Sequence, residues 1–251
     1  MLIITDCRLP TPVKKRLMER ENQVVQLPPH PTLPAPVASH PDMLLFFTED
    51  AIYCEKNYAQ IAKDELTYLS ATLSIELRYI TEELGNYYPF DVKLNAAPVG
   101  SRLFCHPLHT AEKLRNHPAY NVVPVRQGYA KCAVLPVGDS ALITEDPSIA
   151  RVARKNQIDV LQVRHGAVGL NGYSTGFLGG AASFAPFGNT QEILFCGSLD
   201  SHPDADSIRS FCEVRGFEAV SLSEEPLYDV GTMFVFDLNT NKGDKNDERK
   251  N

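Results

Sequence analysis

The sequence lacks the patterns that mark membrane, secreted and metal-binding modules. No apolar run reaches about 18 residues, so we expect no transmembrane helix. The first residues, MLIITDCRLP, do not combine a basic segment, an apolar stretch and a cleavage site, so we expect no secretory signal. Six scattered cysteines form no CxxC pair and have no histidine at zinc-finger spacing. We therefore expect a cytoplasmic protein with reduced thiols, without a metal or a cofactor.

Basic clusters are also missing. The formal net charge is −7, and no group of Lys and Arg alternates with aromatic residues, so we expect no nucleic-acid partner. What the chain does contain is 43% hydrophobic residues in 251, enough for a sizeable core in one large domain or two small ones. The composition gives no indication of an oligomeric state.

The stretch 129–163 gives the clearest structural pattern. It predicts a strand (YAKCAVLP), a short turn, a second strand (ALIT), a helix and a third strand (IDVLQV). Asp146 suits the N-cap of the helix, and Pro147 suits its first position because no backbone N–H is needed there. The unit is therefore ββαβ.

Four other segments repeat this order of elements. In one of them, leucines at spacings of three and four predict a long helix from Leu66 to Leu84, ended by Gly85 and followed by a strand at Asp91–Leu94. The first unit is short of one strand, and Gly231–Asp237 (GTMFVFD) supplies it from the other end of the chain. We therefore predict a single domain over residues 1–238, an α/β propeller of five ββαβ blades closed by the C-terminal strand, with a polar, disordered tail at 239–251.

Five such units in a ring resemble the pentein superfamily, which includes arginine deiminases, amidinotransferases and dimethylarginine hydrolases. The segment CAVLPVGDSALIT (Cys132–Thr144) is similar to a strand pair of amidinotransferases, and Gly179-Gly180 resembles the paired glycines of many of these enzymes. The resemblance implies a thiolate that attacks a guanidinium carbon, a histidine as acid and base, and carboxylates that hold the guanidinium.

The sequence departs from that pattern. The family's His-x-Asp falls on Tyr129-Ala130-Lys131, and no cysteine lies near Gly231, where the nucleophile is expected. Cys132 is then the candidate nucleophile, if Lys131 or His165 lowers its pKa; the alternative is a small core residue.

The remaining candidates border the axial channel that the resemblance implies. Asp229 is a candidate catalytic or cation-holding carboxylate, and the alternative is a turn cap. His165 is a candidate acid–base group or a surface histidine, in a loop whose glycines suit an anion site, a lid or a plain connection. The candidate ligand-binding residues are Asn95, Arg126, Gln127, Tyr129, Lys131, Arg164, Asn171, Tyr173, Gly179 and Gly180.

Three functions remain open at this point. One is a non-standard enzyme acting on a small guanidino or amino-acid-like metabolite, the second a binding protein for such a molecule without chemistry, and the third a structural or interaction protein. Because Arg126, Lys131 and Arg164 are expected opposite Asp229, the sequence favours a zwitterionic or carboxylated ligand.

Overall fold

The computed structural model describes residues 1–20, 22–187 and 190–238, whose strands form five three-stranded sheets. In every sheet the central strand pairs antiparallel with one neighbour and parallel with the other. Sheet by sheet, with the central strand second, the strands are β15 (Phe234–Phe236), β1 (Leu2–Asp6) and β2 (Gln23–Leu27); β3 (Leu45–Phe47), β4 (Ala51–Cys54) and β5 (Glu76–Tyr79); β6 (Ala97–Val99), β7 (Arg102–Cys105) and β8 (Asn121–Pro124); β9 (Leu135–Pro136), β10 (Ala141–Thr144) and β11 (Asp159–Gln162); β12 (Ala182–Phe187), β13 (Thr190–Phe195) and β14 (Phe217–Ser221).

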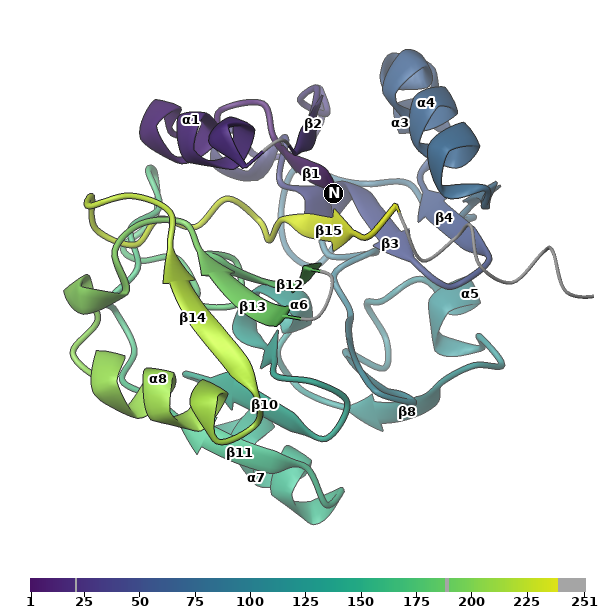
Figure 1. Ribbon diagram of the computed structural model, residues 1–251. Helices are drawn as coiled ribbons and strands as arrows, with labels where there is room; N and C mark the ends of the chain where they lie inside the picture. Colours follow the sequence, from purple (N-terminus) through teal and green to yellow (C-terminus); the bar gives the residue numbers. More distant parts are fainter. Residues whose placement is uncertain (21, 188–189, 239–251) are drawn as a thin grey trace, which may run out of the picture.

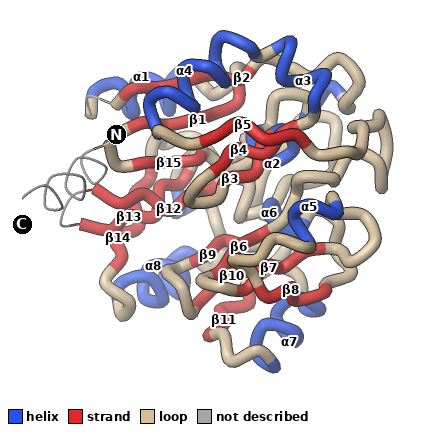
Figure 2. The backbone as a smooth tube through the Cα atoms, turned by 90° about the vertical axis from the view of Figure 1, so that its right-hand side faces the viewer, coloured by secondary structure: helices blue, strands red, loops and turns tan. Residues whose placement is uncertain are grey.

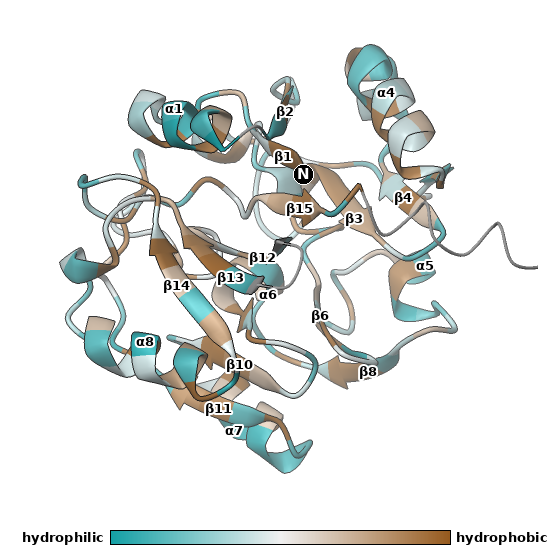
Figure 3. Cartoon of the chain, viewed as in Figure 1, coloured by the Kyte–Doolittle hydropathy of each residue, from teal (hydrophilic) through white to brown (hydrophobic). Residues whose placement is uncertain are grey.

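Helices connect the parallel strand pairs, and most of them lie on the outside. Figures 1 and 2 both place α1, α4, α7 and α8 at the rim of the molecule, whereas the short α6 lies near its centre. The hydropathy colouring agrees, because brown dominates the strands and teal the outer helices (Figure 3). The helices are α1 (Thr11–Glu19), α2 (Pro41–Leu44), α3 (Lys56–Ile61), α4 (Lys63–Leu73), α5 (Glu112–Arg115), α6 (Ala130–Ala133), α7 (Pro147–Lys155) and α8 (Ala205–Glu213), with single 3₁₀ turns at Ala35–Val37 and Leu199–Ser201.

The helix predicted after Asp146 is confirmed. The carboxylate of Asp146 accepts hydrogen bonds from the backbone N–H groups of Ser148 (2.7 Å) and Ile149 (3.1 Å), which have no partner inside the helix. Ile149 and Ala153 are buried on one face. This sequence therefore forms α7 because local capping and apolar spacing agree.

The pairing of the C-terminal strand with the first strand is also confirmed. β15 runs antiparallel to β1, with Ile3 opposite Val235 and Ile4 opposite Phe234. The two ends of the described chain thus share one sheet. The predicted tail at 239–251 lies outside the described residues.

The long helix predicted from Leu66 to Leu84 is wrong. Helix α4 ends at Leu73, Ser74 adopts a left-handed conformation (φ 56°), and the chain continues as β5. A spacing of four residues, as between Leu73 and Leu77, puts two side chains on the same face of a strand, which alternates every two residues, and also on the same face of a helix, which turns every about 3.6 residues. Gly85 ends no helix, and the segment predicted as a strand at Asp91–Leu94 is irregular.

The strand predicted to begin at Tyr129 is also wrong at its start. Residues Ala130–Ala133 form the helical turn α6, and the strand β9 begins only at Leu135. The side-chain oxygen of Asn95 accepts hydrogen bonds from the backbone N–H of Lys131 (2.7 Å) and of Cys132 (3.4 Å). The first backbone N–H groups of this helical turn are therefore bound by a residue far away in the sequence, and a local sequence pattern cannot reveal such a partner.

Candidate functional site

A cavity of about 350 Å³ is lined in part by α6, the short helix that Figures 1 and 2 place near the centre of the molecule. Its walls come from four separate parts of the chain: the segment around α2, the segment around α6, the glycine-rich loop after β11, and the segment before β15. The lining residues are Val37, His40, Met43, Gln127, Tyr129, Cys132, His165, Leu170, Tyr173, Ser174, Thr175, Phe177 and Asp229.

Asp229 is the carboxylate that lines this cavity. Its two oxygens accept hydrogen bonds from the backbone N–H groups of Phe177 and Gly231, each at 2.9 Å, and the residue is only 1% exposed. Burial raises the pKa of Asp229, which means that the surrounding groups do not fully replace the hydration that the ionised carboxylate loses on burial. Gly180 packs so closely against this side chain that an added Cβ would overlap it.

Cys132 also reaches the cavity, through a thiol tied to buried polar groups. Its Sγ donates to Oδ2 of Asp42 at 3.0 Å and accepts from Nδ2 of Asn95 at 3.2 Å. Burial raises the pKa of the Cys132 thiol well above its ordinary value, and the nearby carboxylates Asp42 and Asp229 raise it further. The thiol is therefore protonated and not activated at neutral pH.

Lys131 is buried beside Cys132 but does not line the cavity. Its Nζ donates to Oγ1 of Thr232 at 3.2 Å, and the same hydroxyl lies 3.2 Å from Oδ2 of Asp42 and 2.8 Å from the carbonyl oxygen of Gly179. Burial lowers the pKa of Lys131, while Asp42, Cys132 and Asp229 act in the opposite direction. Thr232 has φ of 62°, which is unusual for a β-branched residue, so the surrounding contacts hold it in a strained conformation.

His40 forms another part of the wall and separates this cavity from a second one of about 310 Å³. Its ring lies between two carboxylates, with Nδ1 at 3.8 Å from Asp229 and Nε2 at 3.7 Å from Asp6. Burial lowers the pKa of His40, so the ring is neutral at neutral pH. Asp6 is already paired with Arg8 at 2.7 Å, which leaves Asp229 as the carboxylate of this group without a cationic side chain in hydrogen-bond contact among the described residues.

Aromatic residues also line the cavity. Tyr129 donates its hydroxyl to Oδ2 of Asp91 at 2.6 Å, and its ring lies 6.4 Å from that of Phe177. Gln127 accepts from the backbone N–H of Tyr129 at 3.1 Å. His165 lies at the rim with its side chain 58% exposed, 3.8 Å from the buried carboxylate of Glu145.

Several residues chosen from the sequence therefore meet at the cavity, and others do not. Cys132, Asp229, His165, Gln127, Tyr129 and Tyr173 line it; Asn95, Lys131, Gly179 and Gly180 lie behind its wall. The glycine pair supports the site, since added Cβ atoms would meet the backbone of Cys132 and the Asp229 carboxylate.

The positive charge expected opposite Asp229 from Arg126, Lys131 and Arg164 is not found among the residues that line the cavity. Arg164 turns away and binds Asp204 through its backbone N–H (2.7 Å), Nε (2.9 Å) and a terminal nitrogen (2.7 Å). Arg126 is exposed and does not line the cavity. Neither of these two arginines therefore contributes a charge to the lining of the cavity.

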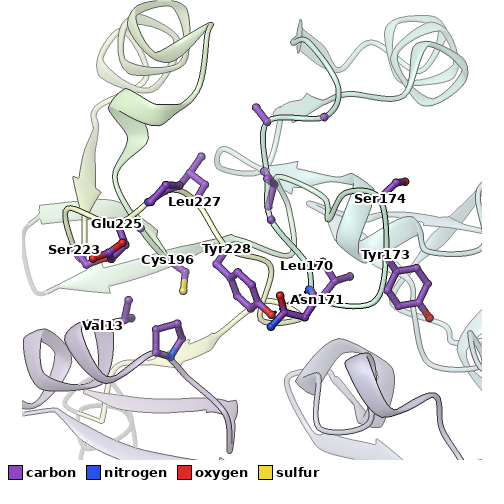
Figure 4. A pocket seen from close by; sticks show the side chains of 17 residues that line it. Val13, Leu170, Asn171, Tyr173, Ser174, Cys196, Ser223, Glu225, Leu227 and Tyr228 are labelled. Carbon is purple, nitrogen blue, oxygen red and sulfur yellow. Dashed lines mark hydrogen bonds between the residues drawn. The ribbon is translucent and has the colours of Figure 1, made fainter.

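Asn171 does not line the central cavity, although it borders the second cavity of about 310 Å³ together with Asp229. It lines an outer groove of about 570 Å³ on the other side of the glycine-rich loop, where its backbone N–H donates to the hydroxyl of Tyr228 at 3.2 Å (Figure 4). Tyr173 borders both the groove and the central cavity. The loop is therefore a thin wall between two open spaces.

Sequence reasoning missed four polar residues of the site: His40, Asp42, Glu145 and Thr232. His40 and Asp42 flank Pro41, the first residue of helix α2, and a proline at a helix start accounts for the local pattern without a functional site. The signal that identifies them is burial, since all four are 6% exposed or less. The described residues contain no group of three or more His, Cys, Asp or Glu side chains suited to a metal ion, and none of their helices is long and apolar enough to span a membrane.

A comparison with protein-family models matches residues 4–234 to a family described as a family of unknown function (DUF6873). The chain belongs to this family. No curated protein matches it.

Among solved structures, the chain is similar to SxtG, an amidinotransferase of the saxitoxin biosynthetic pathway from Microseira wollei, with a TM-score of 0.52 and 11% identity over 84% of this chain and 72% of that one. It is also similar to DDAH from Pseudomonas aeruginosa, solved as a cysteine-to-serine mutant with citrulline, with a TM-score of 0.50 and 8% identity over 89% and 92% of the two chains. At these identities the likeness concerns the fold alone.

Proposed function

We propose that this protein binds a small molecule carrying one planar cation, of the guanidinium or amidinium type, with the cation against Asp229 in the central cavity. The observation that carries the proposal is the buried Asp229 carboxylate, which is oriented by two backbone N–H groups and faces an open cavity. A buried carboxylate without a cationic partner is costly, and a ligand that supplies the cation removes that cost.

The charges around the cavity support a cationic ligand. Asp229 and Asp42 bring two carboxylates, the amine of Lys131 offsets one of them, and His40 is neutral. Among these four groups one negative charge therefore remains when Asp229, Asp42 and Lys131 are ionised, and an ionised Glu145 adds a second. Tyr129 and Phe177 add ring faces that favour a flat cation over a neutral molecule.

The lining of the cavity also argues against a carboxylate on the ligand. No Lys or Arg occurs among the residues that line it, and Arg126 and Arg164 lie elsewhere. This replaces the zwitterion suggested by the sequence. We therefore expect the decarboxylated compound agmatine to bind more tightly than arginine, which has the same guanidinium and chain but adds a carboxylate.

Isothermal titration calorimetry with these two compounds tests the proposal. We expect binding of agmatine, weaker binding of arginine, and a loss of at least about tenfold in agmatine affinity in Asp229→Asn, since a charge-assisted contact is worth about 1.5–3 kcal/mol. Asp204→Asn, which alters a surface carboxylate paired with Arg164, is the matched control and should bind as the wild type does. Equal affinities of the wild type and Asp229→Asn for agmatine would contradict the proposal.

A catalytic role of Cys132 is the second candidate, favoured by one observation: its thiol lines the cavity and lies 3.0 Å from a carboxylate, Asp42, able to accept its proton. Deimination would form a bond from Sγ to the guanidinium carbon, release ammonia, and then consume water to give a ureido product. The raised pKa of the thiol opposes this route. We expect no ammonia from agmatine or arginine; ammonia release that disappears in Cys132→Ser would establish the enzyme instead.

We further propose that residues 1–238 form one domain in which the five sheets close into a five-bladed propeller around this cavity. Contacts between successive sheets support closure: β6 with β9, β9 with β12, and β12 with β15, the strand paired with β1. Each sheet alone has two edges and a small core, so a ring protects what an isolated blade would expose.

A further inference from the structure

Two buried carboxylates hold neighbouring residues of the cavity wall. The backbone N–H of Phe177 donates to Asp229 at 2.9 Å, and the next N–H, that of Leu178, donates to Oε2 of Glu145 at 3.3 Å. Glu145 directly follows strand β10, on a different sheet from the segment that carries Asp229. The two acids thus act on one short stretch of backbone from two sides.

Glu145 is incompletely satisfied in this position. Its side chain is 2% exposed, its Oε1 has no hydrogen-bond partner in the described part of the chain, and Nδ1 of His165 stays at 3.8 Å from Oε2. Burial raises the pKa of Glu145 to about 7, and the charge of Asp229 adds to this effect. Near neutral pH this carboxyl group is therefore divided between its protonated and ionised forms.

We propose that Glu145 is a positioning residue of the cation site, which releases its proton when a cation binds to Asp229 and then holds the Leu178 N–H more firmly. This inference rests on the proposed function. The ligand's positive charge offsets the charge of Asp229, so the ionised form of Glu145 becomes more favourable. An ionised oxygen is also the stronger acceptor for Leu178, and the wall segment that ends in Phe177 is fixed around the ligand.

Other titratable and charged groups face Glu145 and Asp229, and the experiment has to distinguish their protons from the proton of Glu145. Glu145 faces His165 and Asp229, whereas Asp229 faces His40, Asp42 and Lys131. His40 is buried between Asp229 and Asp6 and remains neutral. The proton assigned to Glu145 must therefore be separated from one on His165 or on Asp229 itself.

Linkage gives the size of the effect. With a Glu145 pKa of about 7 in the free protein, binding at pH 7 releases up to about half a proton, and agmatine affinity at pH 6 is up to about tenfold weaker than at pH 8. Glu145→Gln retains an oxygen for the Leu178 N–H but has no proton to release. The agmatine affinity of Glu145→Gln should therefore lose the part of the pH dependence that comes from Glu145, and the pH dependence that remains belongs to Asp229.

Calorimetry with agmatine at pH 7, in phosphate and in Tris, measures the released proton through the different ionisation enthalpies of the two buffers. We expect equal release from the wild type, from His165→Asn and from the exposed-glutamate control Glu218→Gln, and a smaller release from Glu145→Gln, limited to the part that belongs to Asp229. Agmatine binding with equal release in the wild type and Glu145→Gln overturns the inference while leaving the proposed function standing.

A second measurement needs no ligand and no folded Glu145 variant. Carbon-13 NMR of the glutamate carboxyl groups follows the titration of Glu145 in the wild type and in Asp229→Asn. Removing the Asp229 charge should lower the Glu145 midpoint; an unchanged midpoint refutes the coupling whether or not agmatine binds. A lowered midpoint together with no binding of agmatine keeps the coupling and rejects the proposed function.

Discussion

Replacing Gly180 by Ala should damage the site directly, because the glycine makes room for Asp229. A Cβ built on Gly180 would overlap Oδ1 and Cγ of the Asp229 carboxylate. No positive φ is involved at this position, so the requirement for glycine comes from space and not from backbone conformation. The Gly180 carbonyl also accepts from the N–H groups of Val230 (3.1 Å) and Thr232 (2.9 Å), which keeps the backbone from moving away.

The structure gives the approximate magnitude. Forcing one methyl group into a packed interior costs about 1–3 kcal/mol. Displacing Asp229 also breaks at least one of its two hydrogen bonds, to Phe177 or to Gly231, and a hydrogen bond to a charged group contributes about 1.5–3 kcal/mol. We therefore expect Gly180→Ala to lower the free energy of unfolding by about 3–5 kcal/mol and to abolish detectable agmatine binding.

Gly169→Ala is the matched control for this change. Gly169 lies in the same loop region, also without a positive φ, and its added Cβ would meet Cδ2 of Tyr228 at 3.3 Å, a distance that a small side-chain shift relieves. Urea unfolding at pH 7 should show a loss below about 1 kcal/mol for this variant. Equal stability of the two variants would refute the assignment of Gly180 as the residue that makes room for Asp229.

Three further predictions concern the fold and its pH dependence. Deleting residues 234–251 removes β15 and exposes the edge of β1, so circular dichroism should report an unfolded protein, whereas deleting 239–251 should leave the melting curve unchanged; a stable longer deletion would reject the closed ring. Because burial raises the pKa of Glu145 from 4.5 to about 7, its contribution to stability is lost as pH rises through 7, and between pH 5 and 8 the wild type should lose up to about 3 kcal/mol relative to Glu145→Gln in urea titrations. Parallel curves for the two proteins would show that Glu145 titrates normally. Asp146→Ala removes the N-cap of α7 and should cost about 1 kcal/mol of unfolding free energy, while a neutral result would mean that water replaces the cap.

The repeated units are the part of the fold that local sequence patterns determine. Asp146-Pro147 starts α7 because a capping carboxylate and a proline without an N–H suit the first turn of any helix. The missing strand of the first unit was predicted at β15 because this apolar segment of strand length near the C-terminus belongs to no other unit, and β15 does pair with β1. Where a spacing fitted both periods, as at Leu73 and Leu77, the local pattern gave the wrong element.

The cavity depends on contacts between segments far apart in the sequence. Asn95 shapes α6 from 36 residues away, and Asp42 reaches Thr232 across 190 residues. Tertiary packing also decided which charges belong to the site: Arg164 found a partner in Asp204, whereas Asp229 was buried with only backbone donors. The sequence by itself determined elements such as α7 and the C-terminal strand, because capping and periodicity act over a few residues. Only the tertiary structure decided which polar groups lost water together, and this loss of water shifts their pKa values and makes them a candidate site.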